Sequence, residues 1–349
     1  MSETISLVAV GDVLIGPRFE RSDGSLIEGK LPKELEREKP ELAFEKVAAR
    51  LRGADIAFCN LEGALSDRGK MAVGRDSAWK SPPRMIDGIK AAGFNIVSVA
   101  NNHVMDYGPD PLIDTLSLLD KNGIAHIGAG INIHEARKPA ILEKKGCRIA
   151  FLGYSTDVNQ PGRRFPASET KPGIIPIRVF ALFASPHVNL EDMEMMEEDI
   201  KEAKKNSDMV VVSQHFSISV GGSHTLAPHQ EAMARGAIDA GAELVLGHGP
   251  HALQAFEVYK SKAIIYNMGN FVVDRDTDVL DSIIVYAAIS DKKVKKVSFS
   301  PVRINDRGQP EVVSFQSKSG ERIKNLLQKI TKRQHTEITF SGDEGILLA

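Results

Sequence analysis

Side chains that can bind metal ions stand where several apolar runs of the sequence end. The run SLVAVGD ends at Asp12, and the run DIAFCNLE ends at Asn60 and Glu62. The runs NIVSVANNH and MVVVSQH end at His103 and His215. Carboxylates, amides and imidazoles together are the ligand types of a site that holds two divalent cations, and one bridging carboxylate offsets the repulsion between such ions.

A fifth apolar run, AELVLGHGPH, carries two more histidines. Gly247 and Gly249 permit sharp backbone turns that can point His248 and His251 toward one centre. The alternative is a turn with two surface histidines. His215, which directly follows a buried run, favours the metal site because a buried sheet end seldom holds an imidazole without a partner.

The segment ANNHVMD places an amide, an imidazole and a carboxylate within a few residues. Asn102 offers a neutral oxygen ligand, and His103 is a candidate proton donor or stabiliser of the transition state. Asp106 is expected to orient His103 through the other ring nitrogen. The structural alternatives are an Asn-rich turn for this segment and a helix N-cap for Asp12.

Substrate contacts are expected from residues in the polar connections between the apolar runs. Lys80, Arg163 and Arg164 are suited to carboxylates or phosphates, although a solvated loop is the simpler interpretation of each. Asn60 is a further candidate for substrate binding. His224, in the loop GGSH, is placed to reach the mouth of the site.

The apolar runs alternate with helical patterns, which predicts an α/β protein whose strands are buried on both faces of parallel or mixed sheets. Ligands of such sheets bind outside the carboxyl ends of the strands, where these side chains stand. Both halves of the chain follow this plan, which predicts two similar layers that face each other. Strands are expected at 5–11, 55–61, 95–100, 147–155, 209–213, 243–246, 262–274, 282–290, 295–303 and 311–316, and helices at 40–53, 83–94, 111–122, 191–207, 228–240 and 320–333.

Composition excludes several functional classes. The chain has 349 residues, 42% hydrophobic and 26% charged, with a formal net charge of −2, so we expect neither a nucleic acid nor a membrane partner. Cys59 and Cys147 lie in apolar runs and are predicted to be reduced core thiols. Without a signal-like N-terminus, the chain is expected to be cytoplasmic. The oligomeric state stays open, and phosphate-loop, dinucleotide and serine-hydrolase motifs are missing.

The assembled motifs resemble those of the CapA family, the bacterial poly-γ-glutamate capsule synthesis proteins. The resemblance runs from about residue 5 to about residue 290, through VGDVLIG, NLEGALS, WKSPP, GFNIVSVANNHVMDYG, AIDAGAELVLGHGPHALQAFEVY and YNMGNFVVD. It implies a four-layer α/β/β/α sandwich of the calcineurin-like metallophosphoesterase type. Residues 1–349 are then expected to form a single domain, with a C-terminal strand and helix extension from about 291 to 349.

The resemblance also implies roles for single residues. The metal ligands would be Asp12, Glu62, Asn102, His215, His248 and His251, with His103 as the catalytic histidine. Two departures stand out: Leu14 occupies the position of the histidine in a D-x-H pattern, and the usual H-W-G reads His215-Phe216-Ser217. One of the two metal positions is therefore poorer in ligands.

The function expected from these features is a metal-dependent hydrolase that uses two ions of Mn, Fe or Zn. The substrate would be small and anionic or peptide-like, with an amide bond such as a γ-glutamyl bond. Phosphomonoester or phosphodiester hydrolysis is the first alternative, and a non-catalytic partner in poly-γ-glutamate synthesis is the second. A redox role for bound iron also stays open.

Overall fold

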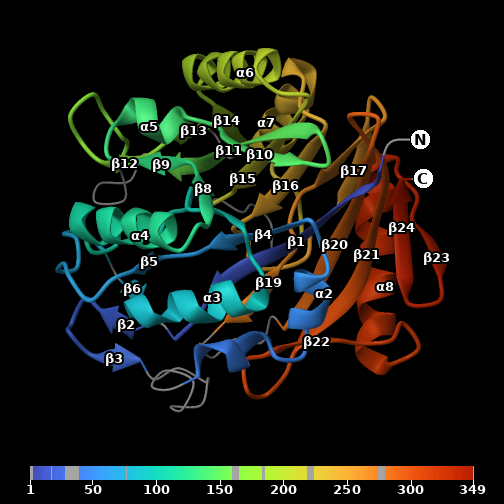
Figure 1. The fold of residues 1–349 in the computed structure, drawn as a ribbon, viewed down its shortest axis with the longest axis horizontal. Helices are drawn as coiled ribbons and strands as arrows, with labels where there is room; N and C mark the ends of the chain where they lie inside the picture. The colour runs from blue at the N-terminus through green and yellow to red at the C-terminus, as the bar shows by residue number, and fades with distance from the viewer. Residues whose placement is uncertain are drawn as a thin grey trace.

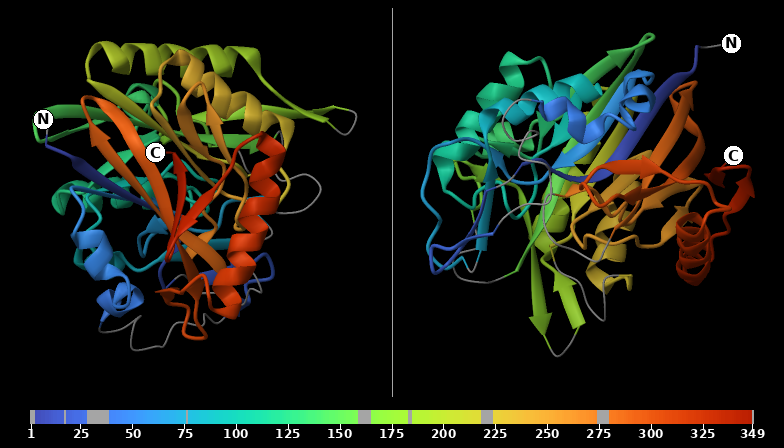
Figure 2. Two further views of the ribbon diagram at one scale, coloured as in Figure 1. Left: turned by 90° about the vertical axis from the view of Figure 1, so that its right-hand side faces the viewer. Right: turned by 90° about the horizontal axis from the view of Figure 1, so that it is seen from below.

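The chain folds into two β-sheets that pack face to face between two layers of helices (Figures 1 and 2). The computed structural model describes residues 3–16, 18–27, 39–75, 77–158, 165–182, 185–217, 224–273 and 280–348. Helices α2, α3 and α4 cover one sheet, and α6 and α7 cover the other. The predicted α/β/β/α sandwich is thereby confirmed.

The first sheet has the strand order β23-β24-β21-β20-β1-β4-β7-β8, with β19 beside β1 and β22 beside β21. Strands β1, β4, β7, β8 and β19 run parallel, whereas β20 is antiparallel to β1. The bounds are β1 (Ile5–Leu14), β4 (Ile56–Leu61), β7 (Ile96–Ser98), β8 (Ala125–Ile127), β19 (Asn270–Val273), β20 (Asp281–Ser290), β21 (Lys293–Ile304), β22 (Pro310–Val312), β23 (Thr339–Ser341) and β24 (Glu344–Leu348).

The second sheet has the order β14-β13-β11-β15-β16-β18-β17, with β10 beside β11. Its central strands β13, β11, β15, β16 and β18 are parallel, so their carboxyl ends share one edge. The bounds are β10 (Ala140–Lys144), β11 (Cys147–Val158), β13 (Pro176–Leu182), β14 (Ser185–Val188), β15 (Met209–His215), β16 (Leu244–His248), β17 (Phe256–Tyr259) and β18 (Lys262–Ile265).

The helices lie close to their predicted positions, but two predicted helices begin with a 3₁₀ turn, and in 83–94 that turn runs directly into the α-helix. The segment expected to form a single helix over 40–53 is divided into a 3₁₀ turn and a short α-helix. The bounds are η1 (Pro40–Phe44), α2 (Ala48–Arg52), η2 (Pro83–Met85), α3 (Ile86–Ala92), α4 (Pro109–Lys121), α5 (Ile133–Arg137), α6 (Leu190–Lys205), α7 (Pro228–Ala240), α8 (Lys318–Thr331) and η3 (Lys332–Gln334).

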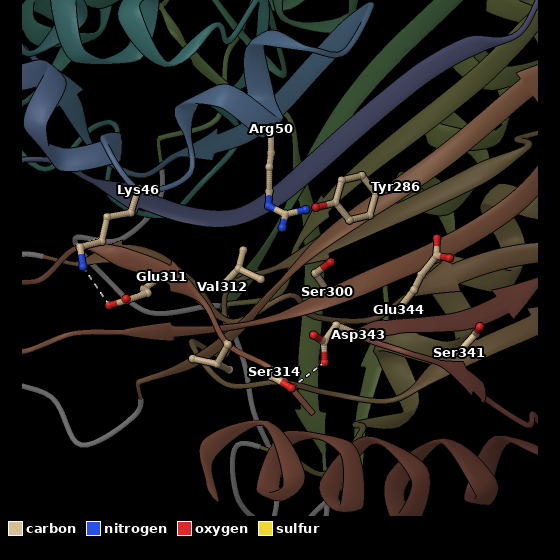
Figure 3. A pocket seen from close by; sticks show the side chains of 11 residues that line it. Lys46, Arg50, Tyr286, Ser300, Glu311, Val312, Ser314, Ser341, Asp343 and Glu344 are labelled. Atoms are coloured by element: carbon tan, nitrogen blue, oxygen red, sulfur yellow. Dashed lines mark hydrogen bonds and ion pairs between the residues drawn. The ribbon is translucent and has the colours of Figure 1, made fainter. Parts of the chain in front are cut away.

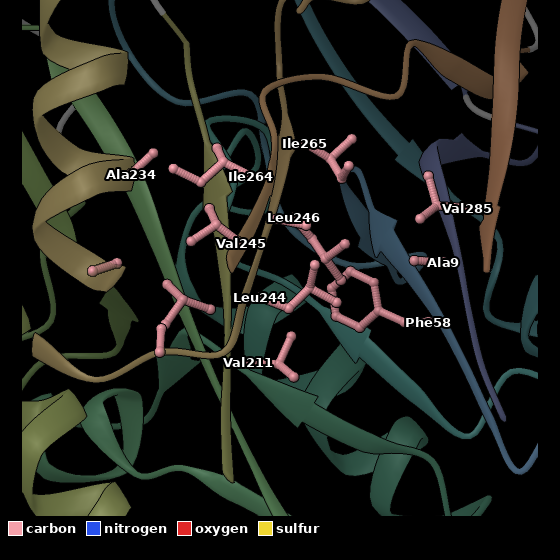
Figure 4. Packing of buried hydrophobic residues seen from close by; sticks show 14 of the residues in the cluster. Ala9, Phe58, Val211, Ala234, Leu244, Val245, Leu246, Ile264, Ile265 and Val285 are labelled. Atoms are coloured by element: carbon pink, nitrogen blue, oxygen red, sulfur yellow. The ribbon is translucent and has the colours of Figure 1, made fainter. Parts of the chain in front are cut away.

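Alternate residues of each strand enter different layers of the core. On β1, Leu7 and Ala9 face the second sheet, while Val8 and Val10 pack against the helices. Figure 4 shows Phe58 of the first sheet packed against Leu244 and Leu246 of β16. Burying each such Leu, Val or Phe side chain contributes about 1.5–3 kcal/mol, so this two-sided packing stabilises the central strands.

The segment 262–274, predicted as one strand, forms two strands in different sheets. β18 belongs to the second sheet and β19 to the first, so the chain crosses between the sheets at residues 266–269. The apolar residues on both sides of Asn267 and Asn270 did not reveal this crossing. Its consequence is that Asn270 pairs in register with Asp12.

Short strands also form in segments that were expected to be irregular. A small sheet is built from four of them: β2 (Arg18–Arg21), β3 (Leu26–Ile27), β5 (Ala64–Leu65) and β6 (Ser77–Ser81). β9 (Ala129–Gly130) pairs with β12 (Gly173–Ile174). These additions bring Trp79, on β6, next to His103.

The C-terminal segment extends the first sheet. β21 and β24 continue it beyond β20, and α8 packs on β17, β20 and β21. Ile323, Leu327 and Ile330 form the buried stripe of α8. Phe299 packs against Phe315 at a ring distance of 6.0 Å, which closes this end of the sandwich.

Candidate metal centre

The predicted ligands converge where the carboxyl ends of β1, β4, β15 and β16 meet between the sheets. In the first sheet Asp12 pairs in register with Asn60, and in the second His215 pairs with His248. Ligand atoms of Asp12, Glu62 and His251 all lie within 4.8 Å of one another. Three segments far apart in the sequence thus meet in a group of metal-binding side chains.

Asp12 stands at the centre of this group. Its Oδ2 lies 3.2 Å from Nδ1 of His251, and its Oδ1 lies 3.6 Å from Nδ1 of His248. Burial by itself raises the pKa of Asp12, but the hydrogen bond with His251 and the charges of the surrounding histidines hold it well below its ordinary value. Asp12 is therefore an anion whose two oxygens face two different sets of ligands.

His248 is the predicted ligand that most clearly needs a partner. The side chain is fully buried, and neither ring nitrogen makes a hydrogen bond with any described residue. Buried polar groups nearly always have a partner, and a divalent cation is a natural partner for a neutral imidazole. Burial lowers the pKa of His248 to about 4, so it is neutral near pH 7.

His215 and Asn102 lie close enough to share an ion. Nε2 of His215 is 2.8 Å from Oδ1 of Asn102, and Nδ1 is 3.2 Å from Nδ2 of Asn60. Asn60 also donates to Oδ1 of Asp12 at 2.8 Å, which sets its amide as the donor. His215 therefore carries its proton on Nε2 and donates it to Asn102. An ion held by both residues would replace that hydrogen bond, since ligand atoms about 2.1 Å from a metal lie about 3 Å apart.

The turn after β16 directs His251 into the site. His251 has a φ of 60°, a left-handed conformation that costs a non-glycine residue about 1–3 kcal/mol. Gly249 has a φ of 108°, and a Cβ there would lie 2.4 Å from the carbonyl oxygen of Phe216. At Gly247 the reason for a glycine is different: the backbone of residue 266 passes so close that a Cβ would lie 2.0 Å from the Tyr266 carbonyl oxygen. Such a backbone persists where the surrounding structure imposes it, and here it points the imidazole toward Asp12 and Glu62.

His103 belongs to a separate hydrogen-bonded group beside the ligands. Its Nδ1 lies 2.8 Å from Oδ2 of Asp106, and its Nε2 lies 3.0 Å from Nδ2 of Asn102 and 4.0 Å from Oε1 of Glu62. The indole of Trp79 stacks on the imidazole with the ring centroids 3.2 Å apart. His103 is thus held at the edge of the ligand cluster with Nε2 toward it.

Leu14 has a structural role at the position where the family pattern places a histidine. It is buried in an apolar cluster with Phe19 and Trp79. Because Trp79 in turn stacks on His103, Leu14 supports the catalytic candidate instead of providing a ligand.

Arg75 stabilises the His103 group from behind. Its Nη2 lies 2.8 Å from Oδ1 of Asp106 and donates to the carbonyl oxygen of Asn102 at 2.6 Å. The side chain of Arg75 is only 3% exposed. We expect Arg75→Leu to lower the free energy of unfolding by about 3–5 kcal/mol, because the Asp106 charge then stays buried without its cation.

Urea unfolding of the purified variant checks this expectation. Lys201→Ala breaks the exposed pair with Glu197 and is the matched control, with an expected change below about 1 kcal/mol. A loss for Arg75→Leu no larger than that of the control would show that the buried ion pair does not stabilise the protein.

His229 predicts an acid sensitivity that is independent of the ligand cluster. It is buried, makes no hydrogen bond with the described residues, and has a pKa lowered by burial to about 4. The unfolded chain takes up this proton below about pH 6.5, whereas the folded chain does so only near its lowered pKa. Stability from His229 is therefore lost as the pH falls from about 6.5 to about 4. His229→Leu should reduce this loss by about 1.4 kcal/mol per pH unit, measured by urea unfolding between pH 6.5 and 4.5, while the exposed His134→Leu leaves the slope unchanged.

Two of the residues expected to contact substrate, Asn60 and Lys80, form hydrogen bonds within the protein. Asn60 is fully buried and its amide contacts Asp12 and His215. Lys80 donates to the carbonyl oxygens of Asp67 and Arg68, at 3.2 and 2.5 Å, and so supports its loop. Both side chains are hydrogen-bonded within the protein, and a role for either in substrate binding stays a prediction.

The other substrate candidates lie away from the cluster or outside the described part of the chain. Arg163 and Arg164 fall outside the described residues. His224 makes a 2.7 Å hydrogen bond with the carbonyl oxygen of Leu253 and borders a cavity that none of the predicted ligands lines.

Sequence interpretation missed three residues that complete the site. Oδ1 of Asn270 lies 3.0 Å from Nδ1 of His251, while Arg75 and Trp79 hold the His103 group. The polar end of YNMGN was a usable signal for Asn270, since it interrupts an apolar run as the other ligand-bearing ends do. No local pattern marked Arg75.

A polar cavity of about 840 Å³ lies far from these residues, between α2 and the C-terminal strands (Figure 3). Lys46 and Arg50 stand on one side of it, and Glu311 and Asp343 line the region of the C-terminal strands. Lys46 forms a half-exposed ion pair with Glu311 at 3.2 Å. None of the predicted ligands lines this cavity.

Comparison with known proteins decides the family. A model of the family described as bacterial capsule synthesis protein PGA_cap matches residues 6–275, a range that contains every predicted ligand. The chain belongs to the PGA_cap family. The expected kinship with CapA proteins is thereby confirmed, and β20, β21 and α8 lie beyond the part that defines the PGA_cap family.

Several members of known name are similar to this PGA_cap chain. The capsule biosynthesis protein CapA of Bacillus anthracis is 28% identical over 337 residues, which cover 95% of this chain and 75% of that protein. The PGA biosynthesis protein CapA of Bacillus subtilis is 28% identical over 335 residues, covering 95% and 78%. A probable polyglutamine synthesis accessory protein of Mycobacterium tuberculosis is 27% identical over 221 residues, covering 63% and 56%.

Among solved structures, TT1561 of Thermus thermophilus aligns with a TM-score of 0.41 and 10% identity, covering 82% of this chain and 99% of that one. Within the described part of this PGA_cap chain, no helix combines the length and the apolar character needed to span a bilayer.

Proposed function

We propose that this chain is a metal-dependent hydrolase in which Asp12, together with the neighbouring histidines and Glu62, would hold divalent ions of Mn, Fe or Zn. The observation that carries the proposal is the convergence of Asp12, Glu62 and His251 within 4.8 Å, beside a buried His248 whose nitrogens make no hydrogen bond with the described residues. An anionic carboxylate and neutral imidazoles are the protonation states that metal binding requires.

The two oxygens of Asp12 divide the ligands into two groups. Oδ2 faces His251, whose Nε2 lies 3.7 Å from Oε1 of Glu62. Oδ1 faces His248 and accepts a hydrogen bond from Asn60. The Asn60 amide also contacts His215, whose other ring nitrogen is hydrogen-bonded with Asn102. Ions held there would supply an activated water and polarise the scissile carbonyl or phosphoryl group.

His103 is the group that would move a proton. In its protonated form, Nε2 can deliver that proton to the leaving group, while Asp106 stabilises the positive imidazolium through Nδ1. Arg75 keeps Asp106 in place, and Trp79 covers one face of the ring. The proton donor is thereby held with its donor atom toward the ligand cluster.

The substrate we propose is an amide that carries carboxylates, such as a γ-glutamyl amide. Relatives named for PGA biosynthesis and for polyglutamine synthesis support this class, since their named products are polymers joined by amide bonds. Phosphoester hydrolysis uses the same kind of two-ion site and is separated from amide hydrolysis by assay.

Metal analysis followed by a substrate panel tests the proposal. The purified protein is analysed for bound metals, loaded with Mn, Zn or Fe, and assayed on γ-glutamyl amides and on nitrophenyl phosphate. Two equivalents of metal with amide turnover is the expected result. Turnover of the phosphate alone would overturn the amide assignment, and a protein that stays inert after loading would favour a non-catalytic partner in polymer synthesis.

A further inference from the structure

A second cavity, of about 530 Å³, is completed by the segment that follows the family match. It is lined in part by His224 and Leu253, and in part by Asp281, Arg303 and Arg322. The last three residues belong to β20, β21 and α8, beyond residue 275. The C-terminal extension therefore provides most of the charge in this cavity.

One segment of backbone contacts both the wall of this cavity and the candidate metal centre. Leu253, in the cavity wall, forms a β-bridge with Met268, and Ser282 Oγ donates to the Met268 carbonyl oxygen at 3.0 Å. The next residue, Gly269, accepts a hydrogen bond from the backbone N–H of Asp12 at 3.1 Å. The same crossing segment thus contacts both the cavity wall and the central carboxylate.

The charges of the cavity favour an anion. Arg322 donates from Nε to Oδ2 of Asp281 at 2.8 Å and pairs with the other oxygen through Nη2. Arg303 lies 3.9 Å from the same carboxylate, too far for a hydrogen bond, and its side chain is 36% exposed. Two guanidinium groups thus face one carboxylate, and His224 adds a ring whose Nε2 makes no hydrogen bond with the described residues.

We propose that this cavity binds a carboxylate of the substrate that is remote from the scissile bond, with Arg303 as the principal contact. A guanidinium group receives a carboxylate through two parallel hydrogen bonds, and the Arg303 guanidinium is not used in such a pair within the described part of the protein. The inference rests on the proposed function, because it names the substrate class of that same site. It assigns to the C-terminal extension the selection of substrates with more than one carboxylate.

Binding to metal-free protein tests the site apart from catalysis. The probe is a γ-linked triglutamate. Calorimetry compares it with the same peptide after its pendant α-carboxylates have been converted to amides. We expect Arg303→Gln to weaken binding of the triglutamate about tenfold, the difference of one charged hydrogen-bonded contact. Arg307→Gln, in the exposed turn that follows β21, is the matched control and should bind as the unaltered protein does. Arg303→Lys should restore part of the loss.

A second measurement uses the metal-loaded protein. The ratio of kcat/KM for a γ-glutamyl substrate with a distal carboxylate over its distal amide should fall about tenfold in Arg303→Gln. Equal triglutamate binding by Arg303→Gln and the unaltered protein, or no binding by either, would overturn the site. Arg303-dependent binding without any turnover would support the site and count against the proposed hydrolase. Turnover with an unchanged ratio would support the proposed hydrolase and count against the site.

Discussion

Asp12→Asn is expected to lower the affinity for metal ions by more than about a hundredfold. The loss of metal should abolish hydrolysis as well. The substitution keeps the shape of the side chain and removes the charge that faces His248 and His251. Residues that only support metal ligands already change affinity by about 10–100-fold, so the loss of the central carboxylate should exceed that range. Metal analysis after dialysis against a fixed free concentration of Mn measures the effect.

The matched control for this variant is Asp239→Asn. Asp239 is a half-exposed carboxylate paired with Lys260, away from the ligand cluster, and its removal should leave metal content unchanged. Urea unfolding in the absence of metal confirms that both variants fold. Equal Mn affinity in Asp12→Asn and the control would mean that Asp12 does not hold the ion.

His103→Ala is expected to lower kcat by about 10²–10⁴-fold while metal content stays the same. The reason is that His103 lies beside the ligands and forms its hydrogen bonds with Asp106 and Asn102. The loss should be larger for a γ-glutamyl alkylamide than for a γ-glutamyl nitroanilide, since the nitroaniline needs less help from a proton donor as it leaves. Steady-state assays on both substrates measure this difference.

The leaving-group comparison separates a proton donor from a structural residue. A structural role for His103 predicts the same fractional loss on both substrates, together with a reduced metal content. Equal losses, or a variant that has lost its metal, would contradict the role assigned to His103.

The convergence of the predicted ligands could be foreseen because most of them stand at or just after the end of a buried strand. A parallel strand that is apolar on both faces has one edge where polar side chains can gather, so Asp12, Glu62, His215 and His248 were expected to converge. The opposing layers followed from the repetition of this pattern in both halves. Periodicity indicated the strand ends and the two layers, whereas the four-layer sandwich and the full ligand set were expected from the family resemblance.

The residues that support the ligands could not be predicted in the same way. The crossing between β18 and β19, which delivers Asn270, is marked only by the short polar interruption at Asn267 and Asn270, which does not show that the two halves of the run enter different sheets. The buried contacts of Arg75 with Asp106, and of Lys80 with its own loop, depend on tertiary packing. A charged residue in a polar connection looks the same in sequence whether it binds substrate or supports a turn.

The cavity beside the metal centre shows the same limit. Arg303 and Arg322 stand on a strand and a helix that the family match does not include, and only the folded chain places them together. The helical periodicity of α8 predicted the helix and its buried stripe, but not the strand ends against which it packs.

Anomalous diffraction from crystals grown with Mn is the most direct test of the account. The convergence of Asp12, Glu62 and His251 predicts a peak within bonding distance of all three side chains, and a second peak between Asp12, His215 and His248. A map with no peak at these side chains at saturating Mn, or with peaks only elsewhere on the protein, would contradict it.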